Sequence, residues 1–262
     1  MPVVHLDGVA IHFETAGDRR RPCLLLSNSL GTDLSMWDAQ TDALASAYFV
    51  VRYDTRGHGR SSSPPGPYTV AQLGGDALAL LDHLDIERAH VCGLSMGGVT
   101  AQWLAVHAPH RVLKLVLANT AARVGTRDGW MDRAASVRSG GLDAIAESSA
   151  SRWFTAGWAA ANAAIAARMA DKLRRQDAEG YAACCEALAV ADLRGDTTRI
   201  AAPTLVIAGR HDPVTTVADG EALCSAIGQS QLAVLEASHI SNVEDPASFS
   251  AVLRKFLTQR KL

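Results

Sequence analysis

Short apolar runs recur along the chain, and most of them are separated by segments long enough for a helix. The runs lie at residues 23–27, 49–53, 89–92, 112–118, 204–208 and 232–235. Almost uninterrupted apolar runs of this kind are typical of strands that are buried on both faces of a sheet. Helices are predicted between them at 69–84, where Thr69-x-x-Gln72 forms a capping box, and at 97–107, which ends before Pro109. This alternation predicts βαβ units and an α/β fold with a doubly wound, mostly parallel sheet.

The first residues follow a different pattern. Residues 9–13 come directly after an Asp7-Gly8 pair, which suits a tight turn with positive φ. We therefore predict a small antiparallel hairpin over residues 3–13.

One long stretch, residues 121–198, breaks the alternation of strands and helices. It contains no convincing strand, but helices are predicted at 130–139, 142–154, 159–176 and 179–192. So many consecutive helices leave no sheet face for all of them to cover, which disfavours a simple covering layer. We interpret the stretch as a helical lid inserted at the carboxyl edge of the sheet, where such folds bind ligands. The predicted core then comprises residues 1–120 and 199–262.

A candidate nucleophile lies between a predicted strand and a predicted helix. The sequence there is Gly93-Leu94-Ser95-Met96-Gly97, a G-x-S-x-G pattern in the strand-to-helix context that a nucleophile elbow requires. The turn of an elbow is so tight that the residues two positions on either side of the serine must be small. Gly93 and Gly97 meet that demand, although a glycine-rich turn without a catalytic serine is the alternative.

A serine hydroxyl is a poor nucleophile unless a histidine accepts its proton and an acid orients the imidazole. In this chain Asp212 follows the predicted strand at 204–208, and His239 follows the one at 232–235. Both therefore belong to the carboxyl edge of the sheet, in the order Ser, Asp, His. Among the competing histidines, His211 has no second acid placed to orient it, and His107 and His110 belong to the far end of a helix.

The oxyanion formed during attack on a carbonyl group needs two backbone N–H donors. One is expected from the residue after the nucleophile, Met96, and the other from the loop after the strand at 23–27, where Leu30 is the candidate. For that loop an ordinary polar turn is an equally good interpretation.

Composition narrows the class of protein further. The chain has 262 residues, of which 48% are hydrophobic and 20% charged, and its net charge is −2. These values exclude a disordered chain, and the absence of a basic tract argues against a nucleic-acid partner. No apolar run is long enough to span a membrane. We expect a small-molecule partner, and nothing in the sequence predicts an oligomeric state.

The pattern of cysteines and the first residues predict a reduced, cytoplasmic protein. The number of cysteines is odd, they lack C-x-x-C spacing, and no signal-peptide pattern precedes them. No group of side chains has the spacing of zinc ligands, and no phosphate-binding loop is present. We therefore predict neither a metal nor another cofactor.

The chain resembles the α/β-hydrolases over essentially its whole length, and within them the β-ketoadipate enol-lactone hydrolases, also called 3-oxoadipate enol-lactonases. The elbow and an Arg-Gly-His-Gly loop are common to many hydrolases, whereas Ser-Asn-Ser-Leu-Gly and Tyr-Asp-Thr-Arg-Gly are more discriminating. The matching stretches are Ser27-Asn28-Ser29-Leu30-Gly31-Thr32-Asp33, Met36-Trp37, Arg52-Tyr53-Asp54-Thr55-Arg56-Gly57-His58-Gly59, Gly66-Pro67-Tyr68, Cys92-Gly93-Leu94-Ser95-Met96-Gly97-Gly98, Ala108-Pro109-His110-Arg111-Val112 and Asn119-Thr120-Ala121.

This resemblance implies an α/β-hydrolase fold and an enzyme that opens a five-membered enol-lactone bearing a carboxylate to give 3-oxoadipate, in the β-ketoadipate pathway of bacterial aromatic breakdown. Two other functions remain open from the sequence. The same triad serves carboxylesterases and cofactor-free perhydrolases, and some hydrolase folds act as ligand receptors.

The carboxylate of such a substrate should meet a cation in a closed site, because an unpaired buried charge is costly. One face of the predicted helix at 130–139 carries, at helical spacing, Trp130, Arg133, Ala134 and Val137. If this face points toward Ser95, Arg133 pairs with the carboxylate and Trp130 packs on the lactone ring. Alternatively, Arg133 reaches solvent, as arginines on amphipathic helices usually do. Arg138 and Arg152 are the other candidates.

Overall fold

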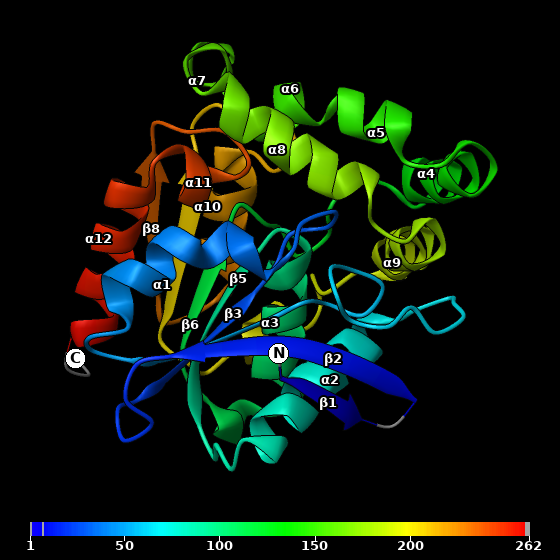
Figure 1. Ribbon diagram of the computed structural model, residues 1–262. Coiled ribbons are helices and arrows are strands. Elements are labelled where there is room, and N and C mark those ends of the chain that lie inside the picture. Colours follow the sequence, from blue (N-terminus) through cyan, green and yellow to red (C-terminus); the bar gives the residue numbers. More distant parts are fainter. Residues whose placement is uncertain (1, 7, 260–262) are drawn as a thin grey trace.

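The centre of the molecule is an eight-stranded sheet, seen in a computed structural model that describes residues 2–6 and 8–259 (Figure 1). The strand order is β1-β2-β4-β3-β5-β6-β7-β8. β2 pairs antiparallel with β1 and β4, whereas all strands from β4 to β8 pair parallel. The strands are β1 (Val3–Leu6), β2 (Val9–Ala16), β3 (Cys23–Ser27), β4 (Phe49–Tyr53), β5 (Ala89–Leu94), β6 (Val112–Ala118), β7 (Thr204–Gly209) and β8 (Ser230–Leu235).

The predicted α/β fold with a mostly parallel sheet is confirmed. Each predicted strand is present; β5 continues to Leu94, directly before the elbow, and β8 begins at Ser230, two residues earlier than predicted. β1 and β2 form the predicted antiparallel hairpin, in which Leu6 is opposite Val9. Asp7, which we expected in its turn, lies outside the described residues.

Helices cover both faces of the sheet because successive apolar side chains of each buried strand point in opposite directions. Leu24 and Leu26 of β3 pack with the face covered by α1 and α12, and Leu25 packs with the face covered by α2, α3 and α10. The helices of the core are α1 (Asp38–Leu44), α2 (Val70–His83), α3 (Met96–His107), α10 (Val217–Ala226), α11 (Ser241–Glu244) and α12 (Pro246–Thr258), with short 3₁₀ turns η1 (Leu34–Trp37), η2 (Pro109–Arg111) and η3 (Thr197–Arg199).

The capping box that the sequence predicts at the start of α2 is present. The Thr69 hydroxyl accepts a hydrogen bond from the Gln72 N–H at 3.2 Å, and the Gln72 side chain accepts one from the Thr69 N–H at 2.9 Å. These bonds satisfy two donors that a helix N-terminus otherwise leaves unpaired, so they stabilise the first turn of α2.

The chain between β6 and β7, called here the helical insertion (residues 121–198), forms a layer of its own. In Figure 1 its green and yellow-green helices lie along the top and right of the molecule, and α4 packs against α9. They are α4 (Arg127–Gly140), α5 (Asp143–Glu147), α6 (Ser149–Trp153), α7 (Ala156–Ala161), α8 (Ala163–Arg174) and α9 (Ala178–Val190).

Two long helices predicted in this insertion are wrong in detail, because each is divided by a polar residue. Ser148 separates α5 from α6, and its hydroxyl donates to the Ala144 carbonyl at 2.9 Å. Asn162 separates α7 from α8, and its side-chain amide donates to the Trp158 carbonyl at 3.0 Å. Such side chains compete with the backbone for the carbonyls of the preceding turn and so favour a break.

None of the helices formed by residues 2–6 and 8–259 combines the length and hydropathy that crossing a membrane requires.

Candidate active site

Ser95 occupies the sharp turn between β5 and α3. Its backbone has a φ of 56°, a value that few residues other than glycine adopt. The turn is held by hydrogen bonds on both sides of the serine: the Ser95 N–H donates to Ala118 O at 3.0 Å, and the Thr120 hydroxyl donates to Ser95 O at 2.8 Å. A constrained turn of this type directs the serine hydroxyl away from the strand.

The two glycines of the elbow are required by close backbone contacts. A Cβ atom at Gly93 would lie 2.0 Å from Gly97 O, and one at Gly97 would lie 2.2 Å from Ser27 O. Both distances are far below van der Waals contact, so any larger residue would force the elbow open. The structure thus explains the small residues from which the elbow was predicted.

The structure brings the three predicted triad residues together in a continuous series of hydrogen bonds. His239 Nε2 lies 3.0 Å from Ser95 Oγ, and His239 Nδ1 lies 2.8 Å from Asp212 Oδ2. All three residues are at least nine-tenths buried. Asp212 and His239 follow β7 and β8, so the parallel strands bring them to the carboxyl edge of the sheet beside Ser95.

The Asp212 carboxylate accepts hydrogen bonds from every polar group that contacts it. Oδ1 accepts from the N–H groups of Val214 and Thr215 at 2.7 and 3.0 Å, and Oδ2 accepts from the Thr215 hydroxyl at 2.8 Å and from Asn119 Nδ2 at 3.0 Å. Burial by itself raises the pKa of Asp212, but the bonds with His239, Asn119 and Thr215 outweigh it and hold that pKa below its usual value. The acid therefore stays ionised under mildly acidic conditions.

Sequence reasoning missed Asn119 as part of this site. It lies directly after β6 with a φ of 43° and bonds Asp212, Ser238 O and the Ser241 hydroxyl. Asparagine is one of the few side chains that tolerate positive φ. The signal available in the sequence was an asparagine at the end of a buried strand, within a stretch already noted for its family resemblance.

The two predicted oxyanion donors lie near Ser95. Met96 is the first residue of α3, so its N–H has no acceptor within the helix. Leu30 lines the same cavity as Ser95 and His239. Among the described residues, the Leu30 N–H has no acceptor within the chain. Both amides are therefore free to bind a ligand oxygen.

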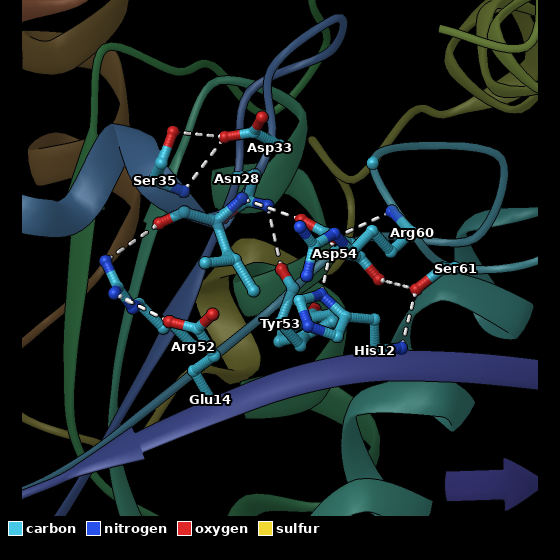
Figure 2. A network of polar contacts seen from close by, with 12 residues as sticks. His12, Glu14, Asn28, Asp33, Ser35, Arg52, Tyr53, Asp54, Arg60 and Ser61 are labelled. Carbon is cyan, nitrogen blue, oxygen red and sulfur yellow. Dashed lines mark hydrogen bonds and ion pairs between the residues drawn. The ribbon is translucent and has the colours of Figure 1, made fainter. Parts of the chain in front are cut away.

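The loop after β3 that carries Leu30 (residues 28–33) is anchored at its two ends by the last residue of β4 and by the residue that follows it. The Asn28 side chain donates to Tyr53 O at 2.8 Å, and Asp54 Oδ1 accepts from the Leu34 N–H at 2.7 Å. Figure 2 shows Asp54 at the centre of this network, where it also contacts His12 Nδ1 at 2.8 Å and accepts from the Arg60 N–H at 2.9 Å. This loop is more than a surface turn, since a buried carboxylate holds it.

Ser95 and His239 open into a cavity of about 410 Å³ between the sheet and the helical insertion. Trp130 and Arg133 of α4 both line it, and the Arg133 guanidinium lies over the Trp130 ring, 4.9 Å from the centroid. Arg133 therefore does not simply reach solvent. Arg138, the first alternative, instead bonds Glu179 and Glu186 outside the cavity.

Arg152 of α6 is a second guanidinium in the cavity wall. Ser148 Oγ and Ile145 O accept hydrogen bonds from it at 2.5 and 2.9 Å. Burial and the positive charge of Arg133 lower the pKa of Arg152. Within the described residues, neither Arg133 nor Arg152 forms an ion pair with a carboxylate, so the cavity holds two cations without a countercharge. An anionic ligand would relieve their repulsion.

The competing histidines lie away from this cavity. The expectation that His211 lacks an acid is wrong, because its Nε2 lies 3.2 Å from Glu236 Oε2, but this pair is exposed. His107 stacks on Trp103 at 4.5 Å at the end of α3, and His110 is exposed.

No group of three or more His, Cys, Asp or Glu side chains that could hold a metal ion occurs in the described part of the chain. The five cysteines are all free.

Comparison with known proteins defines the class and then the family. Residues 22–246 match the alpha/beta hydrolase fold family, so the chain is an α/β-hydrolase. It is 52% identical to 3-oxoadipate enol-lactonase 2 of Acinetobacter baylyi over 98% of this chain and 100% of that one, and 42% identical to 3-oxoadipate enol-lactonase 1 of the same organism over 97% and 96%. The crystal structure of the enol-lactonase from Burkholderia xenovorans LB400 matches with a TM-score of 0.97 at 45% identity, covering 98% of this chain and 100% of that chain. The chain belongs to the family of 3-oxoadipate enol-lactonases.

Proposed function

We propose that this protein hydrolyses 3-oxoadipate enol-lactone to 3-oxoadipate, a step in the breakdown of aromatic compounds, with Ser95, His239 and Asp212 as its catalytic triad. Full-length similarity to enol-lactonases supports the reaction. The observation that carries the choice of substrate is a single cavity that contains both the Ser95–His239 pair and two arginines that form no ion pair within residues 2–6 and 8–259.

Acylation begins when Ser95 Oγ attacks the ring carbonyl carbon and His239 Nε2 takes the hydroxyl proton. The oxyanion that forms accepts hydrogen bonds from the N–H groups of Leu30 and Met96. The ring C–O bond then breaks, His239 returns the proton to the leaving oxygen, and the resulting enol rearranges to the ketone. Because an enol is a better leaving group than an alcohol, this step needs less help from a general acid than ordinary ester cleavage.

Deacylation repeats the same steps with water as the nucleophile. His239 takes a proton from the water as it attacks the acyl carbon, and the same two N–H groups bind the second oxyanion. Collapse releases the carboxylate and returns the proton to Ser95 Oγ. Asp212 stays ionised and stabilises the imidazolium in both halves of the reaction.

We assign recognition of the substrate carboxylate to Arg133, with Arg152 as its neighbour, and contact with the lactone ring to Trp130. This assignment is supported by the position of all three side chains in the cavity wall. Guanidinium groups bind carboxylates through paired hydrogen bonds, and because neither arginine has an acidic partner in the described part of the chain, both are available.

The helical insertion, residues 121–198, would then be the lid over a core formed by residues 1–120 and 199–262. The supporting observation is that it supplies Trp130, Arg133 and Arg152 to the cavity, whereas the core supplies Ser95 and His239. The residues that select the substrate thus belong to the insertion, and the residues that carry out the reaction belong to the core.

The test is turnover of the enol-lactone by the purified protein, followed by its ultraviolet absorbance, beside neutral esters and lactones of similar size. Charged hydrogen bonds to the carboxylate should raise kcat/KM for the enol-lactone above that of the neutral compounds by roughly tenfold to hundredfold. Equal or better turnover of the neutral compounds would contradict the substrate and favour a general carboxylesterase.

A further inference from the structure

His58 is a buried histidine that the triad does not use. It belongs to the Arg56-Gly57-His58-Gly59 loop after β4, and it is 1% exposed. A histidine so completely removed from water normally has a definite hydrogen-bonding task.

One ring nitrogen of His58 contacts the loop at residues 28–33 directly. His58 Nε2 accepts a hydrogen bond from the Gly31 N–H at 2.9 Å. The Gly31 and Leu30 N–H groups belong to neighbouring peptide planes joined at the Leu30 Cα, so anchoring the first restricts the direction of the second. The φ of Gly31 is 80°, a conformation that glycine adopts without the steric cost that other residues incur.

The other side of His58 faces the helical insertion. The Tyr181 ring of α9 lies 6.1 Å from the His58 ring, and Cys184 Sγ lies 4.0 Å from His58 Nδ1. Gly31 is also close to this layer, since a Cβ there would lie 2.7 Å from Leu173 and 3.2 Å from Tyr181. His58 therefore stands between the insertion and the loop that carries Leu30.

The hydrogen bonds of His58 define its tautomer. Because Nε2 accepts, the proton resides on Nδ1, which lies 3.3 Å from Arg56 O. Burial lowers the pKa of His58, although the Arg56 carbonyl and the charges of Asp54, Asp177 and Asp33 oppose this effect. The ring stays neutral, which keeps the Nε2 lone pair available to Gly31.

We propose that His58 is a positioning residue for the oxyanion site: by accepting the Gly31 N–H it fixes the direction of the Leu30 N–H. This inference rests on the proposed role of Leu30 as an oxyanion donor. It predicts a specific defect, because a misdirected donor weakens binding of the transition state and leaves binding of the substrate unchanged.

The experiment compares His58→Leu, which removes the acceptor, with His58→Gln, which keeps one. The matched control is Cys184→Ala, which disturbs packing against the same ring and leaves the Gly31 bond in place. For each variant, kcat and KM are measured on 4-nitrophenyl acetate and on the enol-lactone, with the thermal midpoint and the dissociation constant of a serine-directed boronic acid.

We expect His58→Leu to lower kcat by roughly tenfold to hundredfold with KM unchanged. The dissociation constant of the boronic acid should rise by a similar factor. His58→Gln should retain most of kcat, and Cys184→Ala should lower the thermal midpoint but not kcat. Folded His58→Leu with kcat within a factor of about three of wild type would overturn the proposal. A loss of kcat in Cys184→Ala as large as that in His58→Leu would overturn it as well.

A measurement on the wild-type protein covers the case in which His58→Leu does not fold. Long-range ¹H–¹⁵N spectra should show His58 as the Nδ1–H tautomer over the whole pH range of activity, and protonation of Nε2 within that range without loss of kcat would refute the positioning role. If the wild type turns over only the simple ester, the substrate proposal fails, while the variants still test His58 on that ester.

Discussion

Asn119 donates a hydrogen bond to the same oxygen of Asp212 that His239 contacts: its Nδ2 lies 3.0 Å from Asp212 Oδ2, and His239 Nδ1 lies 2.8 Å from that atom. All the other polar partners of Asp212 are donors too, and two of them are backbone N–H groups that bond Oδ1. Backbone donors cannot reverse their role, so Oδ1 must be an acceptor. Only an ionised carboxylate, which has no proton of its own, is compatible with these donors at position 212.

Asp212→Asn should therefore fail through the histidine. With the amide oxygen held by the backbone N–H groups of Val214 and Thr215, the NH₂ group faces His239 Nδ1 and forces the proton onto Nε2, where it blocks the base. We expect kcat to fall by about a thousandfold or more at neutral pH. Steady-state kinetics check this, with Asp196→Asn, a change in an exposed ion pair with Arg199, as the control. A loss below tenfold would show that Asp212 does not orient the base.

Ser95→Ala should abolish turnover without disturbing the fold, because alanine is as small as the elbow requires and the hydroxyl serves no packing role. The loss of kcat should be at least about a thousandfold. A fluorophosphonate should add covalently to the wild type and not to the variant, as read by intact-protein mass. The nucleophile is elsewhere if the variant keeps a tenth of wild-type activity or is still labelled.

Local rules explain why so much of the site was predictable. Ser95 lies in a turn whose geometry depends on Gly93 and Gly97, only two positions away. Asp212 and His239 follow strands that are nearly pure apolar runs, and parallel strands bring their carboxyl ends to one edge. In such cases sequence neighbours decide the structure, so pattern reasoning is sufficient.

Contacts between distant segments explain what was missed. Whether Arg133, Arg138 or Arg152 faces the cavity depends on how the helical insertion packs on the core. The break at Ser148, which separates α5 from α6, cannot be predicted from helical periodicity. The His211–Glu236 contact joins two loops across the sheet edge, and Asn119 reaches Asp212 from another strand. No spacing rule links such pairs.

His90 should make the protein less stable in mild acid. It is 9% exposed on β5, its Nδ1 has no hydrogen-bond partner among the residues that the structure describes, and burial followed by the charge of Lys114 lowers its pKa to about 4 from 6.5. The folded pKa lies below the unfolded one, so the stabilisation is present above pH 6.5 and is lost as the pH falls toward 4. This single group should account for a loss of roughly 2 kcal/mol between pH 7 and pH 5.

Urea unfolding of the wild type and His90→Leu at both pH values measures this contribution. The difference between the two proteins should shrink or reverse at pH 5, because the variant has no buried imidazole to protonate. His58 has a lowered pKa as well, but it is present in both proteins and cancels in the comparison. Parallel losses of stability in the two proteins would rule out His90 as the cause.

Arg133 and Arg152 should discriminate a charged substrate from a neutral one. Each lines the cavity beside Ser95, and because neither forms an ion pair with an acid among the described residues, we expect the substrate carboxylate to supply the missing charge. Arg133→Ala or Arg152→Ala should raise KM for the enol-lactone by roughly tenfold to hundredfold and change KM for a neutral ester by less than about threefold. Arg138→Ala, which removes a cation paired with Glu179 and Glu186, is the matched control and should affect neither substrate.

The double variant reveals whether the two arginines bind one carboxylate. If both donate to the same group, the losses from Arg133→Ala and Arg152→Ala are coupled, and the double variant loses less affinity than the sum of the two single changes. Removing either cation also relieves the repulsion between the two, which offsets the loss of its contacts with neighbouring residues, so neither single variant should have a much lower thermal midpoint than Arg138→Ala. Equal increases in KM for the charged and the neutral substrate would show that these arginines shape the cavity and do not bind the substrate carboxylate.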